Sequence, residues 1–128
     1  MSKDDKIYFV FLSLLSAAAK GMPFLQKQSS YPGVRKSGCL FCAYCYIAGF
    51  NTISQVDNAF KWAVSKGYVR ESDAYCQLGR SVYPDYLVKQ FGTTKRAGCS
   101  VKQGRGHFYV VDASGREVYN SCGLGCNV

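Results

Sequence analysis

The chain contains one histidine, His107, and any histidine-dependent chemistry must use it. It begins an apolar run, 107–111, that predicts a β-strand, and a turn and a second predicted strand, 116–120, follow. Pairing these strands as a hairpin places Asn120 opposite His107, close enough for an amide oxygen to orient the imidazole. Asp112 in the turn is the alternative orienter, although turn chemistry already explains its position. A histidine that makes one backbone hydrogen bond is the purely structural alternative.

Cys39 is the candidate nucleophile. It follows Gly38 at the start of a helix predicted over 39–50, where unpaired N–H groups and the helix dipole favour a thiolate. Gly38 would let a substrate backbone approach, and the Cys39 N–H could donate to an oxyanion. Cys42 and Cys45 lie one and two turns inside the helix, so we expect them to pack rather than react. The sequence thus offers a thiol version of the nucleophile–base–orienter arrangement, with Cys39, His107 and Asn120 in these three roles.

The seven cysteines are compatible with three chemical states: Cys39, Cys42, Cys45, Cys76, Cys99, Cys122 and Cys126. A secreted protein would hold three disulfides and one reactive thiol. A cytosolic protein would keep seven reduced thiols, since a free cysteine packs as a small hydrophobe. Zinc is disfavoured, because two well-separated ligand pairs are missing and only one histidine is present. We therefore expect neither a metal nor a cofactor.

The N-terminus supports two interpretations. The apolar stretch Ile7–Ala19 has the length and small-residue end of a secretion signal, which would make the protein secreted. Asp4 and Asp5 cancel the positive charge that such a signal needs, and either one is a good helix N-cap. We favour a retained first helix in a cytoplasmic protein. Because 13 residues fall short of the ~20 that span a bilayer, we expect no integral membrane segment.

The remaining pattern predicts an α+β fold. A polar stretch over 27–37 predicts a loop, Thr52-Ile53-Ser54-Gln55 is a capping box before a helix reaching about residue 66, and Pro84 starts a helix over 84–91. Residues 93–102 predict a strand, which precedes the hairpin. We expect one domain over 1–128, with an N-terminal helix and loop in 1–37 and N-terminal helices packed on a small antiparallel β-sheet.

The charge balance indicates anionic partners. Sixteen Lys and Arg against eight Asp and Glu give a net charge of +8, and the stretch 86–111 contains five cations and no acid. Such a field attracts nucleic acid, wall polymers and acidic lipid alike, although a solvated basic face explains it equally well. No nucleic-acid recognition motif accompanies the charge, so nucleic acid is a possible partner that we do not favour.

Several short motifs resemble a known group. In order they are Ser37-Gly38-Cys39-Leu40-Phe41-Cys42, Lys66-Gly67-Tyr68-Val69, Gly106-His107-Phe108, Asp112, Gly115 and Val118-Tyr119-Asn120. The chain resembles small proteins of phages and bacterial mobile elements that look like divergent papain-like thiol peptidases, close to the bacteriocin-processing ones. The resemblance runs from about residue 38 to residue 120.

This resemblance implies a papain-like fold and a thiol hydrolase, either a peptidase or an amidase. The nucleophile, base and orienter would be Cys39, His107 and Asn120, and the substrate a peptide or amide, including anionic cell-wall material. The sequence departs from the pattern in two places: the nearest glutamine before the nucleophile is Gln28, eleven positions upstream, and Asn120-Ser121 stands where the relatives usually have Asp-Pro. The alternative is a non-catalytic papain-like domain that binds or inhibits a host, phage or anionic partner.

Overall fold

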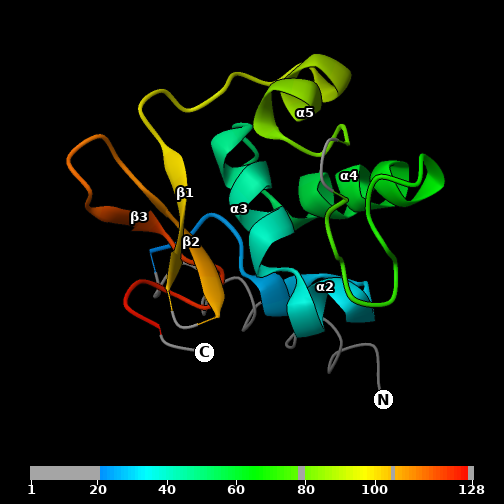
Figure 1. Cartoon of the computed structure of the whole chain (residues 1–128), viewed down its shortest axis with the longest axis horizontal. Coiled ribbons are helices and arrows are strands. Elements are labelled where there is room, and N and C mark those ends of the chain that lie inside the picture. The colour runs from blue at the N-terminus through cyan, green and yellow to red at the C-terminus, as the bar shows by residue number, and fades with distance from the viewer. Residues whose placement is uncertain (1–20, 78–79, 105, 127–128) are drawn as a thin grey trace, which may run out of the picture.

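Helices and a small sheet form an α+β fold in the computed structural model, which describes residues 21–77, 80–104 and 106–126. Its helical elements are η1 (Gln26–Gln28, a 3-10 turn), α2 (Pro32–Ser37), α3 (Cys39–Ile47), α4 (Ile53–Ser65) and α5 (Pro84–Phe91). The strands are β1 (Ser100–Gly104), β2 (His107–Val111) and β3 (Glu117–Tyr119). In Figure 1 the sheet lies on one side of α3, and α4 and α5 lie on the other.

Local chemistry explains where the helices begin and end. Thr52 and Gln55 form the capping box at the start of α4, with the Gln55 N–H donating to Thr52 Oγ1 at 3.2 Å. Pro84 is the first residue of α5, and Gly92 ends that helix in the left-handed conformation with φ 69°. The capping box and the α5 boundaries confirm the predictions from the sequence.

The sheet has the order β1-β2-β3, and both pairs of strands are antiparallel. β1 and β2 pair from Ser100 opposite Val111 to Gly104 opposite His107. The sheet packs against α3 mainly through β2, so the central helix lies against the central strand. In Figure 1 α3 and β2 both start at the end of the molecule nearest α2.

The core surrounds α3, because one face of this helix meets the sheet and another meets the remaining helices. Buried side chains of α3 include Phe41 and Cys45, and Tyr46 stacks on Tyr119 with ring centroids 4.6 Å apart. Arg96 closes the far end of α3, since its guanidinium lies over the Tyr46 ring and donates to the Phe50 carbonyl oxygen at 3.1 Å. This contact ties the segment before β1 to the central helix.

Three expectations about the elements were wrong in detail. The predicted loop over 27–37 contains part of η1 and the whole of α2, because Pro32 acts as a helix-starting residue rather than a loop residue. The helix predicted over 39–50 ends at Ile47. The strand predicted over 93–102 begins only at Ser100, since Arg96 binds the end of α3 and Gly98 has a positive φ.

The predicted N-terminal helix or secretion signal lies outside the described residues. Within the described ranges, no helix is long and apolar enough to cross a bilayer.

Candidate functional site

His107 and Asn120 form a buried hydrogen-bonded pair. His107 Nε2 lies 2.7 Å from Asn120 Oδ1, and the two residues are 6% and 1% exposed. The orientation of the Asn120 amide follows from its other partners, because Oδ1 also accepts the Cys122 N–H and Nδ2 donates to the Cys126 carbonyl oxygen. An amide oxygen facing Nε2 requires a proton on that nitrogen, so Nδ1 of the neutral ring carries the lone pair.

The strand register that brings this pair together differs from the predicted one. The sequence predicted Val110 opposite Glu117 and His107 directly opposite Asn120. Instead Val111 pairs with Glu117 and Val110 pairs with Tyr119, with a bulge in β3 between them. Beyond the bulge, each β2 residue therefore pairs with a residue two positions further along the chain than predicted. Because side chains alternate with a period of two, this slip keeps Asn120 on the face of His107, as a diagonal rather than a direct neighbour.

Cys39 begins α3, as the sequence predicted. It is half-buried, and in the described part of the chain its backbone N–H, like those of the next two residues, has no backbone acceptor. The first hydrogen bond of α3 runs from the Cys42 N–H to the Gly38 carbonyl oxygen. No hydrogen bond joins the Cys39 thiol to His107 among the described residues. The structure therefore pairs His107 with Asn120 and places Cys39 at the first residue of α3. In Figure 1 the starts of α3 and β2 lie at the same end of the molecule.

Gly38 packs against α2, and the expectation that it would let a substrate backbone approach was wrong. It is buried, and a Cβ built there would lie 2.6 Å from the Val34 carbonyl oxygen and 2.9 Å from Val34 Cγ1. The space at this glycine is therefore occupied by α2, and is not open to a substrate backbone. Glycine at this position permits the tight junction at which α2 ends and α3 begins.

The other thiols on and near α3 differ from Cys39 in burial. Cys42 and Cys45 are fully buried, and burial raises the pKa of both thiols. Burial also raises the pKa of Cys76 to about 12, and the nearby Cys39 adds to this effect. The proximity of Cys76 to Cys39 has no signal in the sequence spacing. These environments support the expectation that Cys42 and Cys45 pack rather than react.

The segment after β3 contributes two residues to the site, Cys122 and Cys126, that were not among the predicted site residues. Cys122 and Cys126 form a disulfide, and Cys122 Sγ lies 3.8 Å from His107 Nε2. The available signal was the position of both cysteines within six residues of Asn120. The structure shows none of the three expected chemical states of the cysteines. Instead it has one disulfide and five free thiols.

Asp112 is occupied by the turn between β2 and β3. Its Oδ1 accepts the backbone N–H groups of Ser114 and Arg116 at 2.9 and 3.0 Å, and the Ser114 hydroxyl donates to the same oxygen. These hydrogen bonds lower the pKa of Asp112, and the one from the Ser114 hydroxyl has the largest effect. The turn chemistry predicted for Asp112 is confirmed, and Asn120 is the residue that faces the imidazole.

Gln28, the nearest glutamine before Cys39, lies in η1. Its side-chain oxygen accepts the Leu25 N–H at 2.8 Å, so this end of the amide caps the 3-10 turn.

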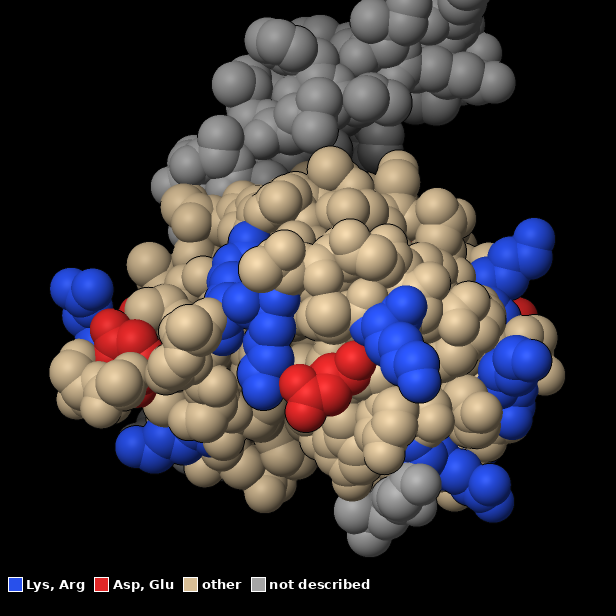
Figure 2. Space-filling model, turned by 90° about the horizontal axis from the view of Figure 1, so that it is seen from above, with Lys and Arg blue, Asp and Glu red and all other residues tan. Residues whose placement is uncertain are grey.

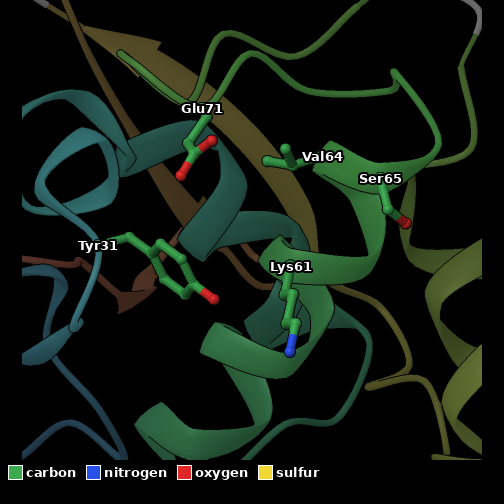
Figure 3. Close-up of a pocket in the computed structure, with 5 residues that line it drawn as sticks. All are labelled: Tyr31, Lys61, Val64, Ser65 and Glu71. Carbon is green, nitrogen blue, oxygen red and sulfur yellow. The ribbon is translucent and has the colours of Figure 1, made fainter.

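A separate hollow of about 320 Å³ lies between the start of α2, the last turns of α4 and the loop that follows α4. Figure 3 shows its lining, which is Tyr31, Lys61, Val64, Ser65 and Glu71. None of the three predicted site residues lines it. Within the described ranges, no group of three or more acidic, histidine or cysteine side chains is arranged to hold a metal ion.

The four described cations of the acid-free stretch do not form one patch. Lys95 pairs with Asp85 at 3.0 Å, and Arg96 is held at the end of α3, whereas Lys89 and Lys102 are exposed. Figure 2 shows basic side chains spaced apart on one face, with an acidic side chain between two of them. On this face the positive charge is therefore spread out rather than gathered on one element.

No protein-family model matches the chain, and no curated protein or solved structure matches it either.

Proposed function

We propose that the protein is a papain-like thiol hydrolase, a peptidase or amidase that uses Cys39, His107 and Asn120. The observation that carries this proposal is the buried contact of 2.7 Å between His107 Nε2 and Asn120 Oδ1. It fixes the tautomer in which Nδ1 is free to accept a proton, as a general base requires. The α+β architecture and the position of Cys39 at the start of α3 agree with a papain-like arrangement.

In the first half of the reaction, His107 Nδ1 takes the proton of the Cys39 thiol. The Cys39 sulfur then attacks the amide carbonyl carbon, the new S–C bond forms, and the carbonyl π electrons move onto oxygen. The Cys39 N–H, which has no backbone acceptor among the described residues, is the candidate donor to this oxyanion. As the oxyanion collapses, the C–N bond breaks and the His107 proton passes to the leaving amine, giving a thioester on Cys39.

In the second half, water attacks the thioester while His107 accepts one of its protons. The C–S bond breaks, the acid product leaves and the Cys39 sulfur takes the proton back from His107. Asn120 holds the imidazole in one orientation through both halves, and its neutral amide exchanges no proton with the ring. The substrate class is a peptide or amide. Cell-wall peptides are the anionic candidates that suit a net charge of +8.

The first test measures how fast iodoacetamide alkylates each cysteine of the folded protein, from about pH 5 to 9, a range that includes the ordinary imidazole and thiol values. Mass spectrometry assigns the label to individual residues. We expect Cys39 to react faster than Cys99, which is a free thiol outside α3 in the same burial class. Cys76 is also half-buried and free, but burial raises its pKa to about 12, so it is a poorer comparator. We expect His107→Gln to slow Cys39 by ~10²-fold or more, the range of a lost general base.

Glutamine is a sharp replacement, because its amide N–H₂ can still donate to Asn120 but carries no titrating base. Cys99→Ala is the matched control and should leave the Cys39 rate unchanged. Hydrolysis of a mixed peptide library should then disappear in Cys39→Ala. A Cys39 rate equal to that of Cys99, or an active Cys39→Ala protein, would contradict the proposal.

A non-catalytic binding domain is the second candidate. It is favoured by the missing hydrogen bond between Cys39 and His107, and by exposed cations such as Lys89 and Lys102. Binding to an anionic polymer through these charges would weaken steeply with salt, whereas hydrolysis through the proposed triad would not follow that slope. A cytoplasmic location remains our prediction for either function.

A further inference from the structure

The segment after β3 folds back on the Asn120 side chain. Within it the Gly123 N–H donates to the Asn120 carbonyl oxygen at 2.9 Å, and the Cys126 N–H donates to the Gly123 carbonyl oxygen at 3.0 Å. These bonds bring the backbones of Cys122 and Cys126 to opposite ends of one amide. The Cys122 N–H donates to Asn120 Oδ1 at 3.3 Å, and Asn120 Nδ2 donates to the Cys126 carbonyl oxygen at 3.1 Å.

The disulfide joins the same two residues that hold this amide. It links Cys122 and Cys126 across a separation of four residues, with their Cα atoms 5.8 Å apart. A covalent bridge over so short a segment restricts the positions that the Cys126 carbonyl can take relative to the Cys122 N–H. The bridge therefore limits how the Asn120 amide can tilt or flip.

The sulfur of Cys122 is also close to the hydrogen-bonded pair of His107 and Asn120. It lies 3.2 Å from Asn120 Oδ1, the oxygen that His107 Nε2 contacts. A disulfide sulfur has no hydrogen to donate, so in the bridged protein it does not compete with His107 for this oxygen. A reduced Cys122 thiol would carry an S–H donor at that distance, and this donor would compete for the same oxygen.

We propose that the Cys122–Cys126 disulfide is a positioning element of the site, which keeps Asn120 aligned with His107 and makes the reactivity of Cys39 depend on redox state. This inference rests on the proposed function. In the opening step, a thiolate of a dithiol reductant such as dithiothreitol attacks one sulfur and the S–S bond breaks. The second thiol of the reductant then displaces the remaining protein sulfur. Both cysteines become thiols, and the reductant becomes a cyclic disulfide.

The experiment compares three forms of the full chain: the oxidised protein, the double variant Cys122→Ala/Cys126→Ala, and the single variant Cys126→Ala, which keeps the Cys122 thiol. Because His107 is the only histidine, ¹⁵N labelling of histidine gives the signals of one imidazole. The signals report the tautomer and the exchange of the Nε2 proton. The alkylation rate of Cys39 is measured on the same samples.

For the oxidised protein we expect one tautomer, with Nε2 protonated and its proton slow to exchange. In both bridge-free variants we expect faster exchange of this proton and slower alkylation of Cys39, by about tenfold, the effect of one ordinary hydrogen bond. Cys126→Ala should be affected more than the double variant, because it retains the competing thiol. Cys99→Ala is the control and should match the oxidised protein.

Unchanged His107 signals in both bridge-free variants would overturn the inference while leaving the hydrolase proposal standing. Altered His107 signals with a Cys39 that is no faster than Cys99 in any form would overturn the hydrolase proposal instead. Should the variants fail to fold, the same spectra recorded while dithiothreitol opens the bridge of the unaltered protein replace them. Seven free thiols in the denatured, unreduced protein would also overturn the inference.

Discussion

Asn120 offers its amide oxygen to the His107 ring and its amide nitrogen to the Cys126 carbonyl, so both ends of one side chain are assigned by their partners. An aspartate there could accept from His107 but would have nothing to donate to Cys126. The half-buried Cys126 carbonyl oxygen would then lose its side-chain donor. The local structure therefore favours asparagine at a position where a carboxylate would serve the imidazole equally well.

Asp73 provides a prediction about acid stability at the scale of one residue. Its hydrogen bonds with Arg70, at 2.8 Å to the guanidinium Nε, lower the pKa of Asp73 to about 2. A carboxyl whose pKa is lower in the folded state contributes stability above its unfolded pKa of about 3.9, and this is lost as the pH falls through about 2. The free energy of unfolding, measured in urea at each pH, should therefore fall less steeply over this window in Asp73→Asn.

The control for this measurement is Glu71→Gln, which removes a neighbouring carboxylate that forms no ion pair in the described part of the chain. A pH dependence in Asp73→Asn that equals that of the unaltered protein would refute the prediction.

At the scale of elements, the junction between α2 and α3 depends on Gly38. A methyl group there would lie 2.6 Å from the Val34 carbonyl oxygen, which is backbone and cannot rotate away. We expect Gly38→Ala to lower the free energy of unfolding by about 1–3 kcal/mol, the cost of overpacking, and to shift the start of α3. Chemical denaturation measures the first effect, and the alkylation rate of Cys39 reports the second.

Gly104→Ala is the matched control, because a Cβ at Gly104 would lie at an ordinary contact distance of 3.5 Å from the Tyr109 ring. The prediction fails if both alanine variants are equally stable.

Elements with strong local signals could be predicted from the sequence, and elements that depend on tertiary contacts could not. The capping box at Thr52 and the proline and glycine around α5 are local, so both helices were predicted well. The strand expected from residue 93 was wrong because Arg96 binds carbonyls and a side chain at the end of α3, more than 40 residues earlier. Propensity alone contains no information about that contact.

In the candidate site too, the features with a local sequence signal could be predicted and the others could not. His107 and Asn120 were predicted to meet because turn chemistry at Asp112 fixed the hairpin. The bulge in β3 could not be predicted, and the pair formed only because the slip was two residues rather than one. The disulfide between Cys122 and Cys126 was also beyond the sequence, since connectivity does not follow from spacing alone.

In the molecule taken as a whole, burial and pairing sort the seven cysteines into four sets. Cys39 and Cys99 are half-buried, and Cys76 is half-buried too, but burial of its thiol raises its pKa to about 12. Cys42 and Cys45 lie in the core with raised pKa values, and Cys122 and Cys126 share the disulfide. We expect iodoacetamide to label only Cys39 and Cys99 of the folded, unreduced protein at pH about 8, near the ordinary thiol value. Unfolding without reductant should expose five thiols, and reduction should expose all seven.

Peptide mapping by mass spectrometry after each treatment gives the counts, and intact mass checks them. Rapid labelling of Cys42 or Cys45 in the folded protein would contradict the packing of α3 against the sheet.

The bulge in β3 has an evolutionary consequence. Beyond it, the face on which Asn120 lies depends on whether the number of strand residues between Glu117 and Asn120 is odd or even. A single-codon insertion or deletion within this part of the strand would turn the amide away from His107, whereas a length change in the turn before Glu117 can be absorbed by the loop. A change of two codons in the strand would restore the face. Homologous genes should therefore differ in the length of this part of the strand by even numbers of residues, or carry a second bulge that compensates.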